Sequence, residues 1–178
     1  MIISCMTLCL LIFLIPTFTL ADTKNIQILG AGRGPVDAIL LSPSTNERYP
    51  AIVYMHGGAV RERGNPVYRP NGDLHFDIND KIKDMSSMGF VVLAPLRNTI
   101  AGCCNGDDVV REGIGIAKSS ARYLRSLPNV LEDKLCLIGF SEGALISMWV
   151  MTEPNDYYKA IIISPSNQCG MRRAGSKN

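Results

Sequence analysis

The sequence carries little net charge: 18 lysine and arginine residues face 16 aspartate and glutamate residues, which gives a formal charge of +2. The two signs are mixed along the chain, so no region produces a field strong enough to gather nucleic acid or an anionic membrane surface. We therefore expect no nucleic acid partner. Internal repeats, low-complexity tracts and domain-sized linkers are also absent, which indicates one domain for 178 residues.

Histidine and metal-ligand spacings are scarce as well. The two histidines are His56 and His75, and both lie in the first half of the chain. The adjacent cysteines Cys103 and Cys104 lack the C-x-x-C spacing of metal sites, so we expect no metal, and no organic cofactor is indicated. With Cys136 and Cys169 they leave three complete disulfide pairings open. Cys136 stands in an apolar run and is predicted to be a buried free thiol.

The first segment has no charged residue between Ile2 and Leu20 and is almost wholly apolar. It ends in Thr19-Leu20-Ala21, which supplies the small residues of a cleavage site before Asp22. This pattern predicts a signal peptide over residues 1–21 and a secreted or periplasmic chain over 22–178 that is not held in a membrane. Because the run approaches the ~20 residues that span a bilayer, an uncleaved membrane anchor is the alternative.

Apolar periodicity in residues 22–178 predicts strands that alternate with helices. A Gly-rich turn at 30–35 lacks the G-x-G-x-x-G spacing of dinucleotide sites and is predicted to join the first two strands. Asp107 or Asp108 is the expected cap of the longest helix. The order predicts an α/β fold, a three-layer sandwich with a mostly parallel central sheet. The expected strands are 25–29, 37–41, 51–55, 90–93, 135–138 and 160–163, and the expected helices are 76–88, 108–127 and 142–151.

A serine stands between the strand at 135–138 and the helix that follows it, in the pattern G-x-S-x-G from Gly139 to Gly143. Glycines at these two places leave room for a sharp strand-to-helix turn that lifts the Ser141 hydroxyl out of the backbone. The strand at 51–55 ends in His56-Gly57-Gly58. We expect the end of this strand and the end of the strand at 135–138 to be neighbours. The amide N–H groups of Glu142 and of Gly58 or Ala59 would then point at one position and stabilise an oxyanion.

Together with "GFVVLAP" at 89–95, these motifs resemble the α/β-hydrolase family, and within it the dienelactone-hydrolase-like and prolyl-oligopeptidase-like branch. The resemblance covers about residues 26–167. It implies that Ser141 is the nucleophile of a serine hydrolase acting on a small ester or peptide-like acyl bond, with an acid and then a histidine later in the chain. The sequence departs from that order, because Glu153 and Asp156 do not follow a strand and no histidine comes after Ser141.

This departure predicts an incomplete α/β-hydrolase domain that is truncated at its C-terminal end, so the polypeptide alone is expected to be weak or inactive. A noncatalytic secreted binding module on the same scaffold is the alternative function. The strand at 160–163 then becomes an uncharged edge, which favours self-association.

The remaining polar residues near the motifs have simpler predicted roles. His56 is predicted to shape the oxyanion loop rather than to act as a base, and His75 is predicted to lie at the start of the next helix. The segment from Ala59 to Leu74 is predicted to be a solvated loop, with binding of a substrate carboxylate by its arginines as the alternative. These arginines are Arg61, Arg63 and Arg69.

Overall fold

The computed structural model of the chain describes residues 22–30, 34–44, 47–97 and 106–165. The predicted leader and Cys103, Cys104 and Cys169 lie outside these ranges. Within them, no helix combines the length and the apolar character needed to cross a membrane.

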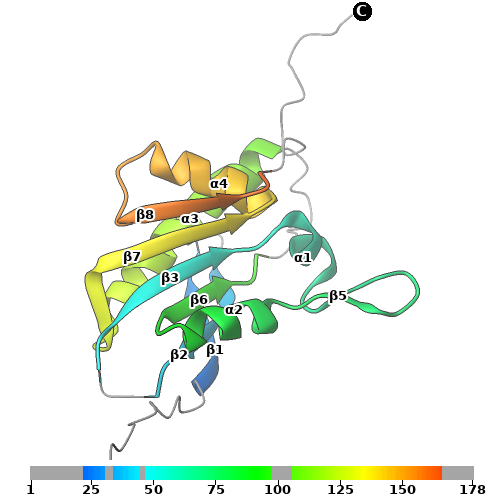
Figure 1. Cartoon of the computed structure of the whole chain (residues 1–178). Coiled ribbons are helices and arrows are strands. Elements are labelled where there is room, and N and C mark those ends of the chain that lie inside the picture. Colours follow the sequence, from blue (N-terminus) through cyan, green and yellow to red (C-terminus); the bar gives the residue numbers. More distant parts are fainter. Residues whose placement is uncertain (1–21, 31–33, 45–46, 98–105, 166–178) are drawn as a thin grey trace, which may run out of the picture.

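The described part of the chain builds one six-stranded sheet in the order β1-β2-β6-β3-β7-β8 (Figure 1). The two N-terminal strands form an antiparallel hairpin, and β2 pairs antiparallel with β6. From β6 through β3 and β7 to β8 every pairing is parallel, so the predicted mostly parallel sheet is confirmed. The strands are β1 (Asp22–Leu29), β2 (Pro35–Ser42), β3 (Tyr49–Met55), β6 (Val91–Pro95), β7 (Val130–Phe140) and β8 (Lys159–Ile163).

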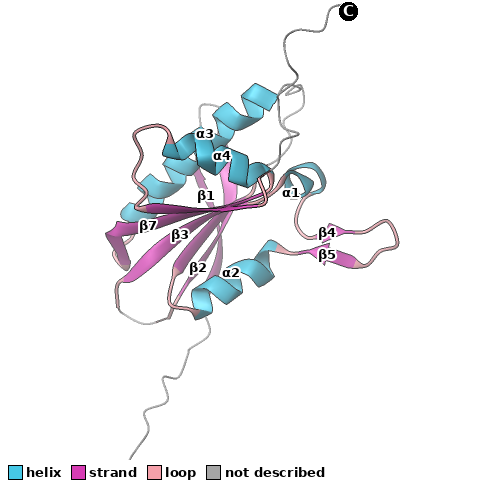
Figure 2. Ribbon diagram, turned by 45° about the horizontal axis from the view of Figure 1, so that its top comes forward, coloured by secondary structure: helices cyan, strands magenta, loops and turns pink. Residues whose placement is uncertain are grey.

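Helices cover both faces of this sheet, which confirms the predicted three-layer α/β architecture. Figure 2 shows α3 (Gly106–Arg125) and α4 (Glu142–Met151) together on one face and α2 (Ile78–Ser87) on the other. The inner strand β3 explains why both faces need a cover. Its residues Ala51, Val53 and Met55 pack in the core beneath α3 and α4. Ile52 and Tyr54 alternate with them and pack in the core beneath α2.

The segment predicted to be a solvated loop, 59–74, is instead partly ordered, and that prediction was wrong. It holds most of the short helix α1 (Gly58–Arg63) and the hairpin of β4 (Val67–Tyr68) and β5 (Leu74–Phe76). Val60 and Val67 explain this, because both are buried in the core beneath α2. A helix of six residues is too short to show a helical period in the sequence.

Element boundaries also differ from the predictions. Helix α2 begins at Ile78 rather than at residue 76, because Phe76 belongs to β5. The Asp77 side chain caps the helix by accepting a hydrogen bond from the Asn79 amide at 2.8 Å. The expected cap positions 107 and 108 lie inside α3 rather than before it, since the helix begins at Gly106. Strand β7 extends well before residue 135, with Val130 paired to Tyr49, but its exposed polar residues 132–134 hid the strand pattern.

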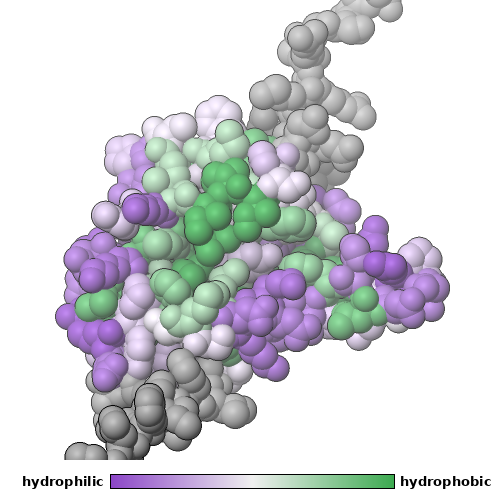
Figure 3. All heavy atoms as spheres, in the orientation of Figure 1, coloured by the Kyte–Doolittle hydropathy of each residue, from purple (hydrophilic) through white to green (hydrophobic). Residues whose placement is uncertain are grey.

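Strand β8 lies at one edge of the described sheet and carries an exposed apolar surface. Ile161 and Ile163 are 52% and 43% exposed, and Figure 3 shows strongly hydrophobic side chains gathered on this face of the molecule. Apart from Lys159 at its first position, this edge strand is uncharged, and an edge strand presents unpaired backbone groups to other chains. Self-association through β8 therefore remains our prediction.

We expect residues 22–178 to form oligomers, and Ile162→Lys to shift them toward monomer, because a lysine on an edge strand opposes edge-to-edge pairing. Sedimentation velocity at several protein concentrations measures this. Met88→Lys, at an exposed apolar position outside the sheet, is the matched control. A monomeric parent chain would contradict the prediction.

Candidate active site

Ser141 occupies a strained turn between the end of β7 and the start of α4. Its backbone has φ 55° and ψ −114°, a region that a residue with a side chain rarely adopts. Its N–H donates to the Ile163 carbonyl at 3.0 Å, and its carbonyl accepts from the amides of Ala144 and Leu145. Such strain costs of order 1–3 kcal/mol and persists only where the surroundings fix it. The side chain makes no capping hydrogen bond to the helix.

The two glycines of the pattern are required by close backbone approach. A Cβ on Gly143 would lie 2.0 Å from the Met55 carbonyl oxygen and 2.7 Å from that of His56. A Cβ on Gly139 would lie 2.4 Å from the Gly143 carbonyl oxygen. The turn is therefore pressed against the end of β3, where Met55 pairs with Gly139, so the two strand ends are neighbours as predicted.

The residues predicted to supply oxyanion amides surround this turn. A Cβ on Gly57 would lie 3.2 Å from Cβ of Ser141, and a Cβ on Gly58 would lie 3.2 Å from a carboxylate oxygen of Glu142. Gly58 and Ala59 begin α1, and Glu142 begins α4. The first amides of a helix have no partner inside it. Both helix starts lie at the edge of the sheet where β3 and β7 end.

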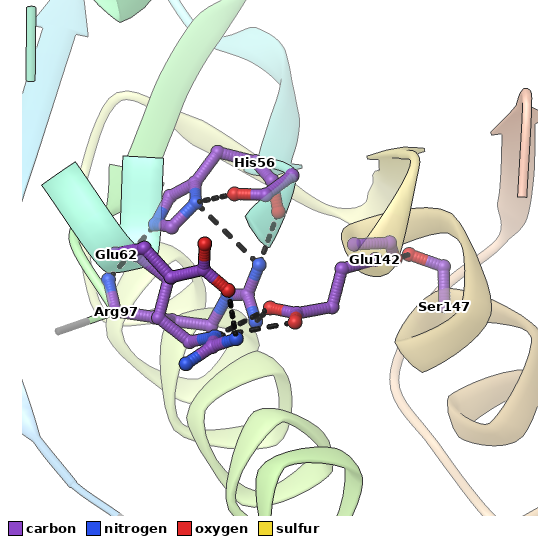
Figure 4. A network of polar contacts seen from close by, with 8 residues as sticks. His56, Glu62, Arg97, Glu142 and Ser147 are labelled. Carbon is purple, nitrogen blue, oxygen red and sulfur yellow. Dashed lines mark hydrogen bonds and ion pairs between the residues drawn. The ribbon is translucent and has the colours of Figure 1, made fainter. Parts of the chain in front are cut away.

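A buried ion network lies behind the turn (Figure 4). The Glu142 carboxylate accepts from Nη1 of Arg97 at 2.8 Å and from Nε of Arg61 at 3.0 Å. The side chains of Glu142, Arg97 and Arg61 are only 3%, 4% and 15% exposed. Arg61 is thus not the solvated residue that we predicted, whereas Arg63 and Arg69 are exposed. The burial of Arg97 was not predicted from the sequence. Its place two residues beyond β6, at the edge where open α/β sheets form binding sites, was the signal that could have indicated a functional position.

His56 is fully buried and committed to structure. Its Nε2 accepts a hydrogen bond from the Arg97 backbone N–H at 2.9 Å, which assigns the proton to Nδ1, the atom 2.8 Å from the Gly57 carbonyl. Burial, and after it the charge of Arg97, lowers the pKa of His56 to about 3. A neutral imidazole with both nitrogens engaged does not accept a proton from Ser141.

The other candidate acid and base groups lie elsewhere. His75 is exposed on β5 in the hairpin that projects from the sheet in Figures 1 and 2, so it is not at the start of α2 as predicted. Stacking of Phe76 on Phe140, with ring centres 6.3 Å apart, joins this hairpin to the end of β7. Glu153 and Asp156 each pair with a basic residue of α3 at 2.6 Å. Cys136 is a free thiol, half-buried rather than fully buried.

Comparison with known proteins identifies the fold. No family model matches the sequence. The structure resembles acetyl xylan esterase 1 from Thermoanaerobacterium sp. JW/SL YS485, with a TM-score of 0.62 and 20% identity over 84% of this chain and 49% of the esterase. It also resembles the α/β-hydrolase GrgF from Penicillium sp. sh18, with a TM-score of 0.61 and 12% identity over 81% of this chain and 46% of GrgF. The chain has the α/β-hydrolase fold.

A curated protein is also similar in sequence. The uncharacterized peptidase YtmA of Bacillus subtilis (strain 168) is 30% identical over 118 residues, which make up 66% of this chain and 41% of YtmA. The chain thus spans less than half the length of each of these three proteins.

We expect the pH dependence of stability to reveal His56. Its pKa is about 3 in the fold against 6.5 unfolded, so the unfolded chain binds more protons between these values. The free energy of unfolding should therefore be unaffected by this group above pH 6.5, and should fall by up to about 1.4 kcal/mol per pH unit as pH drops toward 3. Urea unfolding across this range should show a shallower slope for His56→Gln. Equal slopes would contradict the assignment.

Gly143→Ala should lower the free energy of unfolding by about 3 kcal/mol, because its Cβ meets two backbone carbonyls that cannot rotate away. Gly72→Ala is the matched control. Gly72 has φ +87° and open space around it, so an alanine there adds only left-handed backbone strain of about 1–2 kcal/mol. Urea unfolding of both variants makes the comparison, and equal losses would argue against a tightly packed turn.

Proposed function

We propose that this protein is a serine hydrolase of the dienelactone-hydrolase-like and prolyl-oligopeptidase-like branch, acting on a small-molecule ester or peptide-like acyl bond. The carrying observation is the strained backbone of Ser141 at a strand-to-helix turn, pressed against the Gly57-Gly58 loop. The similar proteins named above include an esterase and a peptidase, and this supports an acyl bond as the target of the reaction.

In the proposed reaction, Ser141 Oγ forms a bond to the acyl carbon, and the carbonyl electron pair moves onto its oxygen. The amides of Glu142 and of Gly58 or Ala59 stabilise this oxyanion, where one donor contributes about 10²–10³ in rate. Collapse of the intermediate breaks the bond to the leaving group, which takes the proton removed from the serine. Water then releases the acid by the same steps and restores the hydroxyl.

The proton acceptor in this proposal is a histidine that follows Ser141 in the gene, together with its acid. Neither histidine of the sequence fits the role, because His56 is held neutral in the core and His75 lies on the projecting hairpin. The same observation favours the second candidate function, a noncatalytic secreted binding module.

For location, we propose export, with the signal peptide 1–21 removed after Ala21 and the hydrolase domain beginning at Asp22. An uncleaved anchor is the alternative. N-terminal sequencing of the protein recovered from the medium or periplasm distinguishes the two.

A fluorophosphonate probe tests the hydrolase proposal. We expect the product of the complete open reading frame to be labelled at Ser141, and Ser141→Ala to lose the label, because only an activated serine displaces fluoride from phosphorus. Ser87→Ala removes an exposed hydroxyl and is the matched control. Intact-mass and peptide spectrometry locate the label.

A folded, unlabelled protein would support the binding module instead. Reading the coding DNA beyond the codon for Asn178 is an inexpensive check. An open frame with two further strands, an aspartate and a histidine is expected, and an in-frame stop without them would count against the hydrolase.

A further inference from the structure

Three separate parts of the chain meet at the Glu142 carboxylate. We infer that Glu142, held between Arg61 and Arg97, is a positioning residue that sets the Gly57-Gly58 loop against Ser141. The role of that loop in oxyanion binding rests on the proposed function, whereas the positioning itself does not.

The first support is that one carboxylate joins both helix starts. Glu142 is the first residue of α4, and its two oxygens lie 3.0 and 3.2 Å from Nε of Arg61 in α1. One of these oxygens also lies 3.2 Å from where a Gly58 Cβ would be, so the carboxylate packs directly against the loop. The distance between the two proposed amide donors therefore depends on this side chain.

The second support is that Arg97 binds His56, the residue directly before the Gly57-Gly58 loop. Its Nη1 donates to Glu142 at 2.8 Å, its Nη2 donates to the His56 carbonyl, and its backbone N–H donates to His56 Nε2 at 2.9 Å. His56 in turn contacts the Gly57 carbonyl through Nδ1 at 2.8 Å. Arg97 thus holds His56, His56 contacts the Gly57 carbonyl, and the Glu142 carboxylate packs beside Gly58. Figure 4 shows His56, Arg97 and Glu142 in this network.

The third support is the balance of charge. A lone carboxylate beside the nucleophile would repel a forming oxyanion and would be costly to bury. Two guanidinium groups contact this carboxylate, and Glu62, which pairs with Arg61 at 3.1 Å, is exposed. The Glu142 carboxylate is therefore compensated by two guanidinium groups, which reduces its repulsion of an anion near the Glu142 amide.

An alternative role for the network is to stabilise the fold as a whole, and local measurements separate the two. We would compare Glu142→Gln and Arg61→Met with Lys118→Met. The last breaks the partly exposed pair of Lys118 with Glu153 and matches Arg61→Met in charge. Hydrogen exchange read by mass spectrometry is followed in peptides that cover 56–61 and in peptides of α3.

In both network variants we expect exchange at 56–61 to be at least about tenfold faster while α3 stays unchanged, and Lys118→Met to leave 56–61 as in the parent. Arg61 is at the rim of the network, so Arg61→Met keeps the test open if Glu142→Gln does not fold. Unchanged exchange at 56–61, or equal acceleration in α3, would overturn the inference.

Fluorophosphonate kinetics on the complete gene product connect the loop to chemistry. The network variants should lower the maximal labelling rate by about 10–100-fold with little change in probe affinity, because a displaced amide acts on the transition state. If Ser141 in the parent is not labelled, the proposed function fails, and the exchange result still decides the positioning role. Labelling at the parent rate in both variants would overturn the inference.

Discussion

Close backbone contact between the Ser141 turn and the end of β3 is the constraint on which the rest of the site depends. Two glycines permit it, since a Cβ on Gly143 would overlap the Met55 carbonyl and one on Gly139 would overlap that of Gly143. The contact holds the unusual dihedral angles of Ser141 and places the loop after β3 beside the hydroxyl. Cores on both faces of the sheet keep the two strands in register, so the geometry rests on many contacts and not on the turn alone.

The parts of this architecture that follow from local pattern could be predicted from the sequence. Strand β3 and helix α4 are examples, because a continuous apolar run and a G-x-S-x-G turn identify them without knowledge of distant residues. The structure also agrees with the expected adjacency of the two motifs. Helix α1 and the β4-β5 hairpin were missed because they are short and are stabilised by tertiary burial of Val60 and Val67.

The ion network was beyond sequence reasoning for a different reason. Burial of a charged side chain is decided by its partner, and Arg97 meets Glu142 from 45 positions away. Arg61 looks like an ordinary loop arginine until α1 turns it toward the same carboxylate, 81 positions away. The role of His56, in contrast, could be predicted. Its place inside the His-Gly-Gly motif already indicated a structural role, and its burial and its hydrogen bonds in the structure fit that role.

The shared carboxylate also couples the evolution of three residues that lie far apart in the sequence, Arg61, Arg97 and Glu142. Removing one member of a buried charge cluster leaves an uncompensated ion, whereas exchanging the whole cluster for apolar side chains of similar volume is often neutral. Loss of one of Arg61, Arg97 and Glu142 is therefore costly, whereas exchange of all three need not be. Sequences in which only one of the three is replaced would be disfavoured, so the three residues should be kept or replaced together.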